Sequence, residues 1–66
     1  MRLIHTEMSD TGARVEVRYS SHLEEYHFHL YSRHNVRVYE ADYYTESGED
    51  ARGTARLMLV QHDRHQ

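Results

Sequence analysis

Polar and apolar residues alternate along most of residues 13–43. Alternate side chains of a β-strand point to opposite faces of a sheet, so this period of two predicts strands with one apolar face. The apolar positions are Val15, Val17, Tyr26, Phe28, Leu30, Val36 and Val38. The polar positions are Arg14, Arg18, His27, His29, Tyr31, Arg37 and Tyr39. We therefore expect a sheet whose second face carries Arg, His and Tyr.

The same pattern divides the chain into four strands. The first two cover residues 2–8 and 13–20, and the turn at 9–12 contains Ser, Asp, Thr and Gly, which favours a hairpin. The third covers residues 26–31, and the fourth runs from about residue 36 to residue 44. Strict alternation in the fourth strand would place Glu40 and Asp42 on the apolar face, which is unfavourable for unpaired carboxylates. Either this strand extends past the core, or a bulge turns Tyr39, Ala41 and Tyr43 inward.

Residues 21–32 also fit a short helix. Ser21 and Glu24 match a capping box. The residues at helical spacing are Leu23, Tyr26, His27 and Leu30. A helix here would give a ββαββ order. The alternation in residues 26–31 and the compact turn at 33–35 favour the strand.

The period changes to that of a helix in residues 45–63. One stripe contains Ala51, Ala55, Met58, Leu59 and His62. Ser47 and Asp50 resemble a capping box, whereas Gly53 costs about 1 kcal/mol relative to Ala within a helix. Residues 57–60 fit a buried fifth strand as the alternative, which would make the fold all-β. We favour the helix.

These elements predict one α+β domain over residues 1–66: a four-stranded antiparallel meander with one C-terminal helix packed on one face. The other face stays open, which water tolerates when that face is polar. A chain of 66 residues has a thin core, and without cysteine it has no disulfide to reinforce it. We therefore expect a homodimer, in which a second subunit covers apolar surface.

Composition narrows the classes of function. The chain has eight Arg, no Lys and a formal charge of −3. The lack of cysteine excludes thiolate metal sites and a cysteine nucleophile. No apolar run approaches the length of a membrane span, and the first ten residues lack the apolar core of a signal peptide, so we expect a cytoplasmic protein. We expect no enzyme either, because the serines lack a G-x-S-x-G turn and so short a chain has little volume for a pocket.

Tyr and Arg are the residues most enriched at the energetic centres of protein interfaces. The polar face therefore predicts a small binding or regulatory protein that acts by stoichiometric contact with a macromolecular partner, such as an inhibitor from a phage or mobile element. A protein partner is preferred, and no cofactor is implied. The predicted partner-binding residues are Arg14, Arg18, His27, His29, Tyr31, Arg37 and Tyr39.

Three alternatives use the same residues or their neighbours. Arg and Tyr on a sheet also suit single-stranded nucleic acid, although the net charge is negative and no RNP-like motif is present. His27 and His29 form an H-x-H pair that could bind a divalent metal ion, and a neighbouring strand could add His5 or a carboxylate such as Glu16. No third ligand at a fixed spacing is evident. Five acidic residues within 40–50 could imitate nucleic-acid phosphates, as a special case of partner binding.

Overall fold

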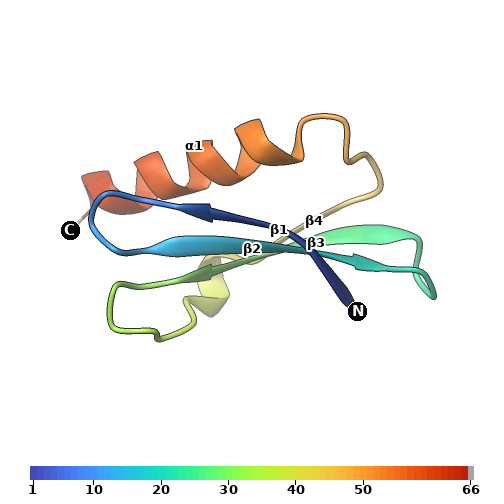
Figure 1. Ribbon diagram of the computed structural model, residues 1–66, viewed down its shortest axis with the longest axis horizontal. Helices are drawn as coiled ribbons and strands as arrows, with labels where there is room; N and C mark the ends of the chain where they lie inside the picture. Colours follow the sequence, from blue (N-terminus) through green and yellow to red (C-terminus); the bar gives the residue numbers. More distant parts are fainter. Residues whose placement is uncertain (66) are drawn as a thin grey trace.

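The computed structural model describes residues 1–65 and contains one sheet and one long helix. The elements are β1 (Arg2–Met8), β2 (Arg14–Ser20), β3 (Glu25–Tyr31), the 3-10 helix η1 (Tyr39–Ala41), β4 (Tyr43–Thr45) and α1 (Ala51–Arg64). The strands are antiparallel and lie in the order β1-β2-β3-β4, with α1 crossing one face of the sheet (Figure 1). The predicted α+β meander is confirmed, and the all-β and ββαββ alternatives are wrong.

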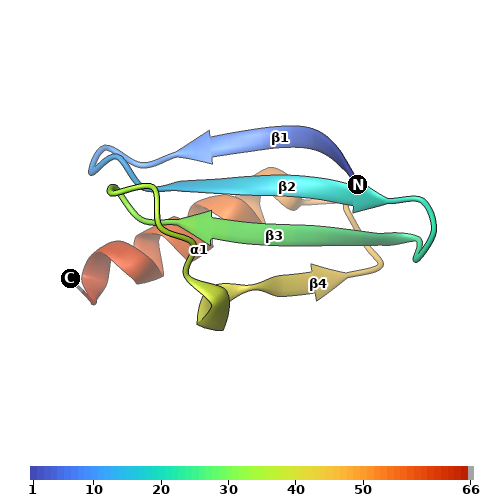
Figure 2. The same cartoon turned by 90° about the horizontal axis from the view of Figure 1, so that it is seen from below.

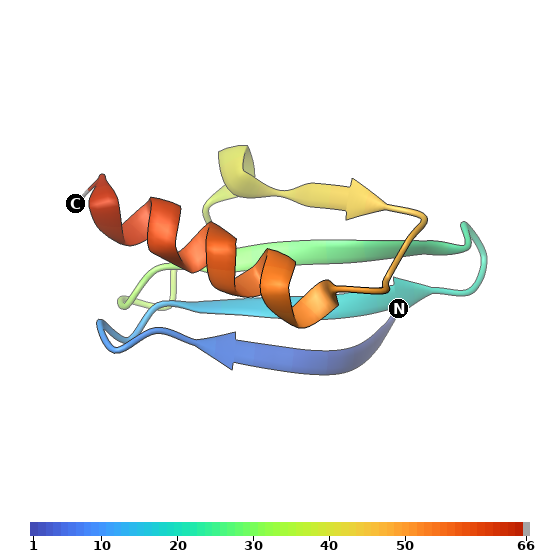
Figure 3. The same ribbon diagram turned by 90° about the horizontal axis from the view of Figure 1, so that it is seen from above.

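The face of the sheet beneath α1 carries the hydrophobic core (Figure 3). Strands of period two supply one side of this core and the helical stripe supplies the other, as the pattern predicts. The fully buried apolar residues are Ala13, Val15, Val17, Phe28, Leu30, Ala55 and Leu59. Tyr26, Val38, Ala41, Ala51 and Met58 pack around them while remaining partly exposed.

The β1–β2 hairpin closes where its sequence favours a turn. Ser9 N–H donates to the Ala13 carbonyl at 2.8 Å, and Gly12 has a φ of +95°, a conformation that favours glycine. An irregularity between Leu3 and His5 shifts the register with β2. As a result His5 lies opposite Val17, on the face that α1 covers.

Helix α1 begins with a side-chain cap. The Asp50 carboxylate accepts a hydrogen bond from Gly53 N–H at 3.2 Å, so Asp50 itself is the N-cap and the Ser47–Asp50 capping box is wrong. A Cβ at Gly53 would overlap the Asp50 carboxylate. Gly53 lowers the stability of the helix interior in principle, but its lack of a side chain leaves room for the Asp50 cap. No helix within residues 1–65 is long and apolar enough to cross a membrane.

The predicted fourth strand over 36–44 is wrong in its extent. Val36, expected on the apolar face, is 61% exposed directly after the turn at residues 33–35. Tyr31 and Arg37 form an isolated bridge, and η1 interrupts the chain before the three residues of β4. The 3-10 turn changes which side chains face the core.

The inward rotation expected from a bulge thus occurs in part, with η1 as its cause. Ala41 packs against the core, and the Tyr43 ring lies 5.6 Å from the Phe28 ring between centroids. Tyr39 differs from that expectation, because it is 69% exposed.

Candidate protein-binding face

The sheet face opposite α1, which we call the open face, has no secondary-structure element packed over it within residues 1–65 (Figure 2). The strand registers place alternate residues of β2 and β3 on it. The segment after β3 adds further side chains that contact these. The open face comprises Arg14, Glu16, Arg18, His27, His29, Tyr31, Arg37, Tyr39, Asp42 and Tyr44.

One cluster on the open face centres on Glu16 of β2. Arg14 Nε and Arg18 Nη2 donate to its two carboxylate oxygens at 3.1 and 2.9 Å. The Arg14 guanidinium lies over the Tyr31 ring, 4.2 Å from its centroid, and also donates to Asn35 Oδ1 at 2.8 Å. These contacts hold the Arg14 guanidinium over an aromatic ring.

A second cluster repeats this arrangement at the other side of β3. Arg37 Nη2 and Nε donate to Asp42 at 2.7 and 3.4 Å, and Tyr44 Oη donates to the same carboxylate at 3.3 Å. The Arg37 guanidinium lies 4.5 Å from the centroid of the Tyr39 ring. Each cluster therefore joins a carboxylate, an arginine and a tyrosine ring.

The two histidines lie beneath these clusters. His27 is 8% exposed and His29 is 5% exposed, so both are less accessible than their position on a polar face suggests. The His27 ring meets the Tyr44 ring edge-on at 4.6 Å, and its Nε2 atom lies 3.3 Å from Glu25 Oε1. Burial and the positive charge of Arg37 lower the pKa of His29.

The carboxylates of the open face are less exposed than its guanidinium groups. The Glu16 and Asp42 side chains are 14% and 12% exposed, against 26–31% for Arg14, Arg18 and Arg37. The outermost layer therefore presents guanidinium and phenol groups, with the acids below them.

The arginines determine the charge state of these two acids. Burial alone would raise the pKa of Glu16, but hydrogen bonds from Arg18 and Arg14 outweigh it, and the pKa falls below its ordinary value. The pKa of Asp42 falls for the same reason, since the hydrogen bond and charge of Arg37 outweigh burial. Both acids are ionised at neutral pH, and each compensates an arginine next to it.

The structure brings all seven predicted partner-binding residues together on the open face. Three further residues of the open face, Glu16, Asp42 and Tyr44, were not among the predicted ones. Alternation places Glu16 between Arg14 and Arg18, and this signal was available in the sequence. For Asp42 the only signal was the bulge alternative, which turns Tyr39, Ala41 and Tyr43 inward and so leaves Asp42 on the open face.

No third ligand for a metal ion joins His27 and His29 in the described part of the chain. The imidazole rings of His27 and His29 lie 6.1 Å apart between centroids. Within residues 1–65, no three His, Asp or Glu side chains gather closely enough to hold a metal ion.

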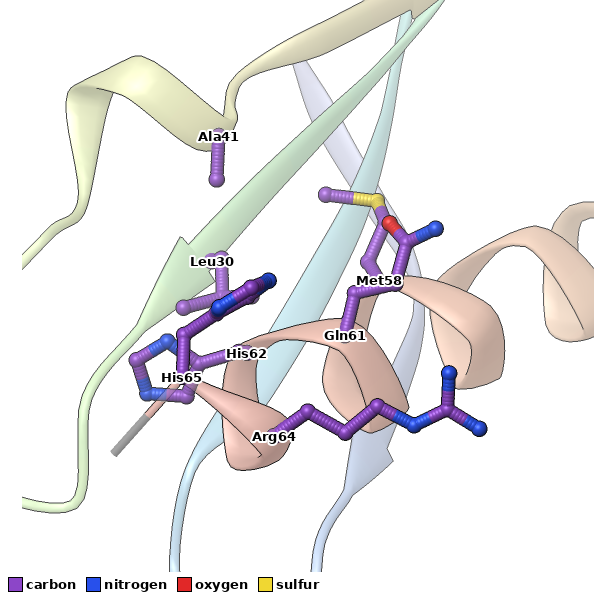
Figure 4. A pocket seen from close by; sticks show the side chains of 7 residues that line it. All are labelled: Leu30, Ala41, Met58, Gln61, His62, Arg64 and His65. Atoms are coloured by element: carbon purple, nitrogen blue, oxygen red, sulfur yellow. The ribbon is translucent and has the colours of Figure 1, made fainter.

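A shallow hollow lies on the other side of the sheet, between the end of α1 and η1 (Figure 4). Its wall is partly aliphatic, and two imidazoles and a guanidinium lie at the helix end. The lining residues are Leu30, Ala41, Met58, Gln61, His62, Arg64 and His65. None of these lining residues is a carboxylate.

The open face is thus the most organised polar surface among the residues that the structure describes. Two carboxylates hold three arginines there, and two of the arginines lie against tyrosine rings. Comparisons with protein-family models, with curated proteins and with solved structures found no match to this chain.

Proposed function

We propose that this chain is a small, non-enzymatic binding protein that regulates or inhibits a protein partner by stoichiometric contact through the open face. One observation carries the proposal: Arg14 and Arg37 are each fixed by a carboxylate and by an aromatic ring. Immobilising a long side chain costs about 0.5–1.5 kcal/mol on binding. A face whose arginines are already ordered avoids much of that cost.

The remaining hydrogen-bond donors indicate the chemistry of the partner. A guanidinium carries five N–H groups, and Arg37 uses its Nε and Nη2 on Asp42, which leaves Nη1 for another molecule. The Tyr39 ring is 69% exposed beside it. Such a surface suits a protein that presents carboxylates, main-chain carbonyls and apolar side chains.

Charge favours a protein over a nucleic acid. Glu16 and Asp42 compensate much of the positive charge of the three arginines on the open face. The whole chain has a formal charge of −3. Nucleic-acid affinity depends on neutralising many phosphates, which requires a basic footprint.

The proposal includes a homodimer. Leu3, Ile4 and Met8 of β1 are 45%, 41% and 65% exposed, although a domain of this size needs all the apolar burial it can obtain. A second copy of the chain would cover such side chains.

Capture from a lysate of the source cells tests partner binding. The wild-type chain is immobilised beside Arg37→Ala and Tyr39→Ala, and captured proteins are identified by mass spectrometry with and without nuclease. We expect a nuclease-resistant protein that binds the wild type in a 1:1 ratio of chains and binds each variant at least about tenfold more weakly.

Leu57→Ala is the matched control, because Leu57 is 58% exposed on α1, away from the open face. It should bind like the wild type, and the melting temperatures of all variants should stay close together. Capture that nuclease abolishes, or affinity that Arg37→Ala and Tyr39→Ala leave unchanged, would contradict the proposal.

A further inference from the structure

Strand β1 forms one border of the sheet along its whole length (Figure 2). β4, with three residues, forms the other border. Natural sheets commonly block exposed edges with Pro, charged side chains or bulges. In β1 the irregularity between Leu3 and His5 interrupts the edge, and the regular stretch over residues 5–8 is suited to pairing with another strand whose charges match its own.

The backbone of β1 shows which residues are available for pairing. Ser9 N–H donates to Ala13 across the hairpin, and alternate residues of a strand direct their backbone groups to the same side. His5 and Glu7 therefore direct theirs toward β2. Thr6 and Met8 direct theirs away from the sheet, where a further strand would lie.

Side-chain charge selects the partner strand and its register. A two-fold axis perpendicular to the sheet pairs β1 with its own copy in antiparallel orientation. Centring on Glu7 would place two carboxylates directly opposite each other, and centring on His5 would oppose two imidazoles. Centring on Thr6 places His5 opposite Glu7 of the second copy, twice by symmetry, which is the complementary arrangement.

The geometry around Glu7 agrees with this register. Glu7 and His5 lie on the same face of β1 and are 2.8 Å apart between Oε1 and Nε2. Arg56 of α1 lies 3.4 Å from the other Glu7 oxygen. In the Thr6-centred pair, the two His5–Glu7 pairs become neighbours and form one cluster of alternating groups.

Apolar side chains flank the same edge on both faces. Met8, at 65% exposure, would meet the region of Ile4 of the second copy, and Thr6 would meet Thr6. On the α1 side, Val60 is 44% exposed and borders a shallow hollow that Glu7 and Met8 also line. A second copy would remove this apolar surface from water.

We infer that β1 pairs antiparallel with β1 of a second copy, centred on Thr6, so that two sheets join into one with both α1 helices on the same side. This inference deepens the homodimer part of the proposed function by naming its surface. It leaves the open face of each copy free for a partner.

Analytical ultracentrifugation of the full chain tests the interface by charge exchange. The wild type should sediment at twice the chain mass of 8.0 kDa. His5→Glu opposes two carboxylates at both symmetric positions, and Glu7→Arg replaces the acceptor of each His5 with a second donor, so each should raise the dimer dissociation constant about tenfold or more. Mixed in equal amounts, the two variants should form a heterodimer, because the new carboxylate at position 5 faces the new guanidinium at position 7.

Glu46→Arg is the matched control, since it makes the same charge change beside β4, at the other border, and should leave the dimer intact. Circular dichroism verifies that each variant is folded. A wild type that is monomeric at about 1 mM, a dimer that both β1 substitutions leave intact, or folded variants that fail to pair when mixed would overturn the inference. A monomer that still captures a partner would contradict only the dimer, and a dimer that captures nothing would contradict only the binding proposal.

Discussion

Two adjacent residues of β3, His29 and Leu30, are almost equally inaccessible for opposite reasons. Leu30 is 1% exposed on the face that α1 covers, and His29 is 5% exposed on the open face. The helix and η1 bury Leu30. No helix within residues 1–65 packs over His29. The charged groups near enough to act on it all belong to the open face, and they are Arg37, Asp42, His27 and Arg18. Burial on the first face is a property of the fold, whereas burial on the second depends on a layer of long polar side chains that a partner could rearrange.

The two faces consequently contribute differently to stability. Removing apolar surface from water supplies most of the free energy of folding, and the covered face does this. Partly exposed ion pairs contribute about 0–1 kcal/mol each, so the open face adds little stability while fixing the positions of its arginines. The following substitutions test this division, from the largest expected effect to the smallest.

Phe28→Ala should have the largest effect. Phe28 is fully buried beneath α1, and removing its ring from a core costs about 3–5 kcal/mol. A domain of this size has a total stability of similar order, so the variant should be largely unfolded in urea titrations followed by circular dichroism. His27→Ala, one position away on the open face, should cost less than half as much. Equal costs for the two variants would show that the open face is a second core.

Gly48→Ala should come next. A Cβ at position 48 would overlap the ring of Tyr26, which packs against the core on the covered face. Overpacking of this kind costs about 1–3 kcal/mol and should lower the melting temperature in calorimetry. Ser47→Ala, at the exposed neighbouring position, should be within about 0.5 kcal/mol of the wild type. A stable Gly48→Ala would mean that the Tyr26 ring moves aside at little cost.

Glu16→Gln should cost about 1 kcal/mol at neutral pH, because it leaves Arg14 and Arg18 without their shared carboxylate. The folded pKa of Glu16 is below the ordinary value of 4.5. The stability that it contributes is therefore present above pH 4.5 and is lost as the pH falls through the lower folded pKa. Urea midpoints at pH 7 and pH 3 should differ less in the variant than in the wild type. If the two midpoints differ as much in the variant as in the wild type, other carboxylates cause the loss of stability at low pH.

His29→Gln should have the smallest effect, visible only as a change in pH dependence. Burial and the charge of Arg37 hold the folded pKa of His29 below 6.5, with His27 and Arg18 acting in the same direction and Asp42 opposing them. Stability from this group is fully present above pH 6.5 and is lost as the pH falls toward the folded pKa. Between pH 7.5 and 5.5 the wild type should lose more stability than His29→Gln in urea titrations. Identical losses would show that His29 titrates normally.

The sequence was sufficient to predict the side chains of the covered face, because both of its layers follow a strict period. Val15 and Val17 alternate in β2, Phe28 and Leu30 alternate in β3, and Ala55 begins the buried stripe of α1. Each of these periods extends over a complete element. A regular period of this kind specifies which side chains face the core before any contact is known.

The structure of the region after β3 could not be predicted from a regular period. η1 replaces the middle of the expected strand, and a 3-10 turn at Tyr39–Ala41 has no period that a strand pattern could detect. The place of Asp42 beside Arg37 follows from that turn. The unfavourable position of Glu40 and Asp42 in a continuous strand was the one sign in the sequence that the strand would be interrupted.

The shortness of β4 has a consequence for motion. Three residues at the border of a sheet open more easily than the seven-residue strands inside it, and local opening proceeds in such cooperative units. Amide protons of η1 and β4 should therefore exchange with solvent ahead of those in β2 and β3. The portion of the open face that carries Tyr39 and Asp42 would then be the most adaptable, and a bound protein would slow its exchange most.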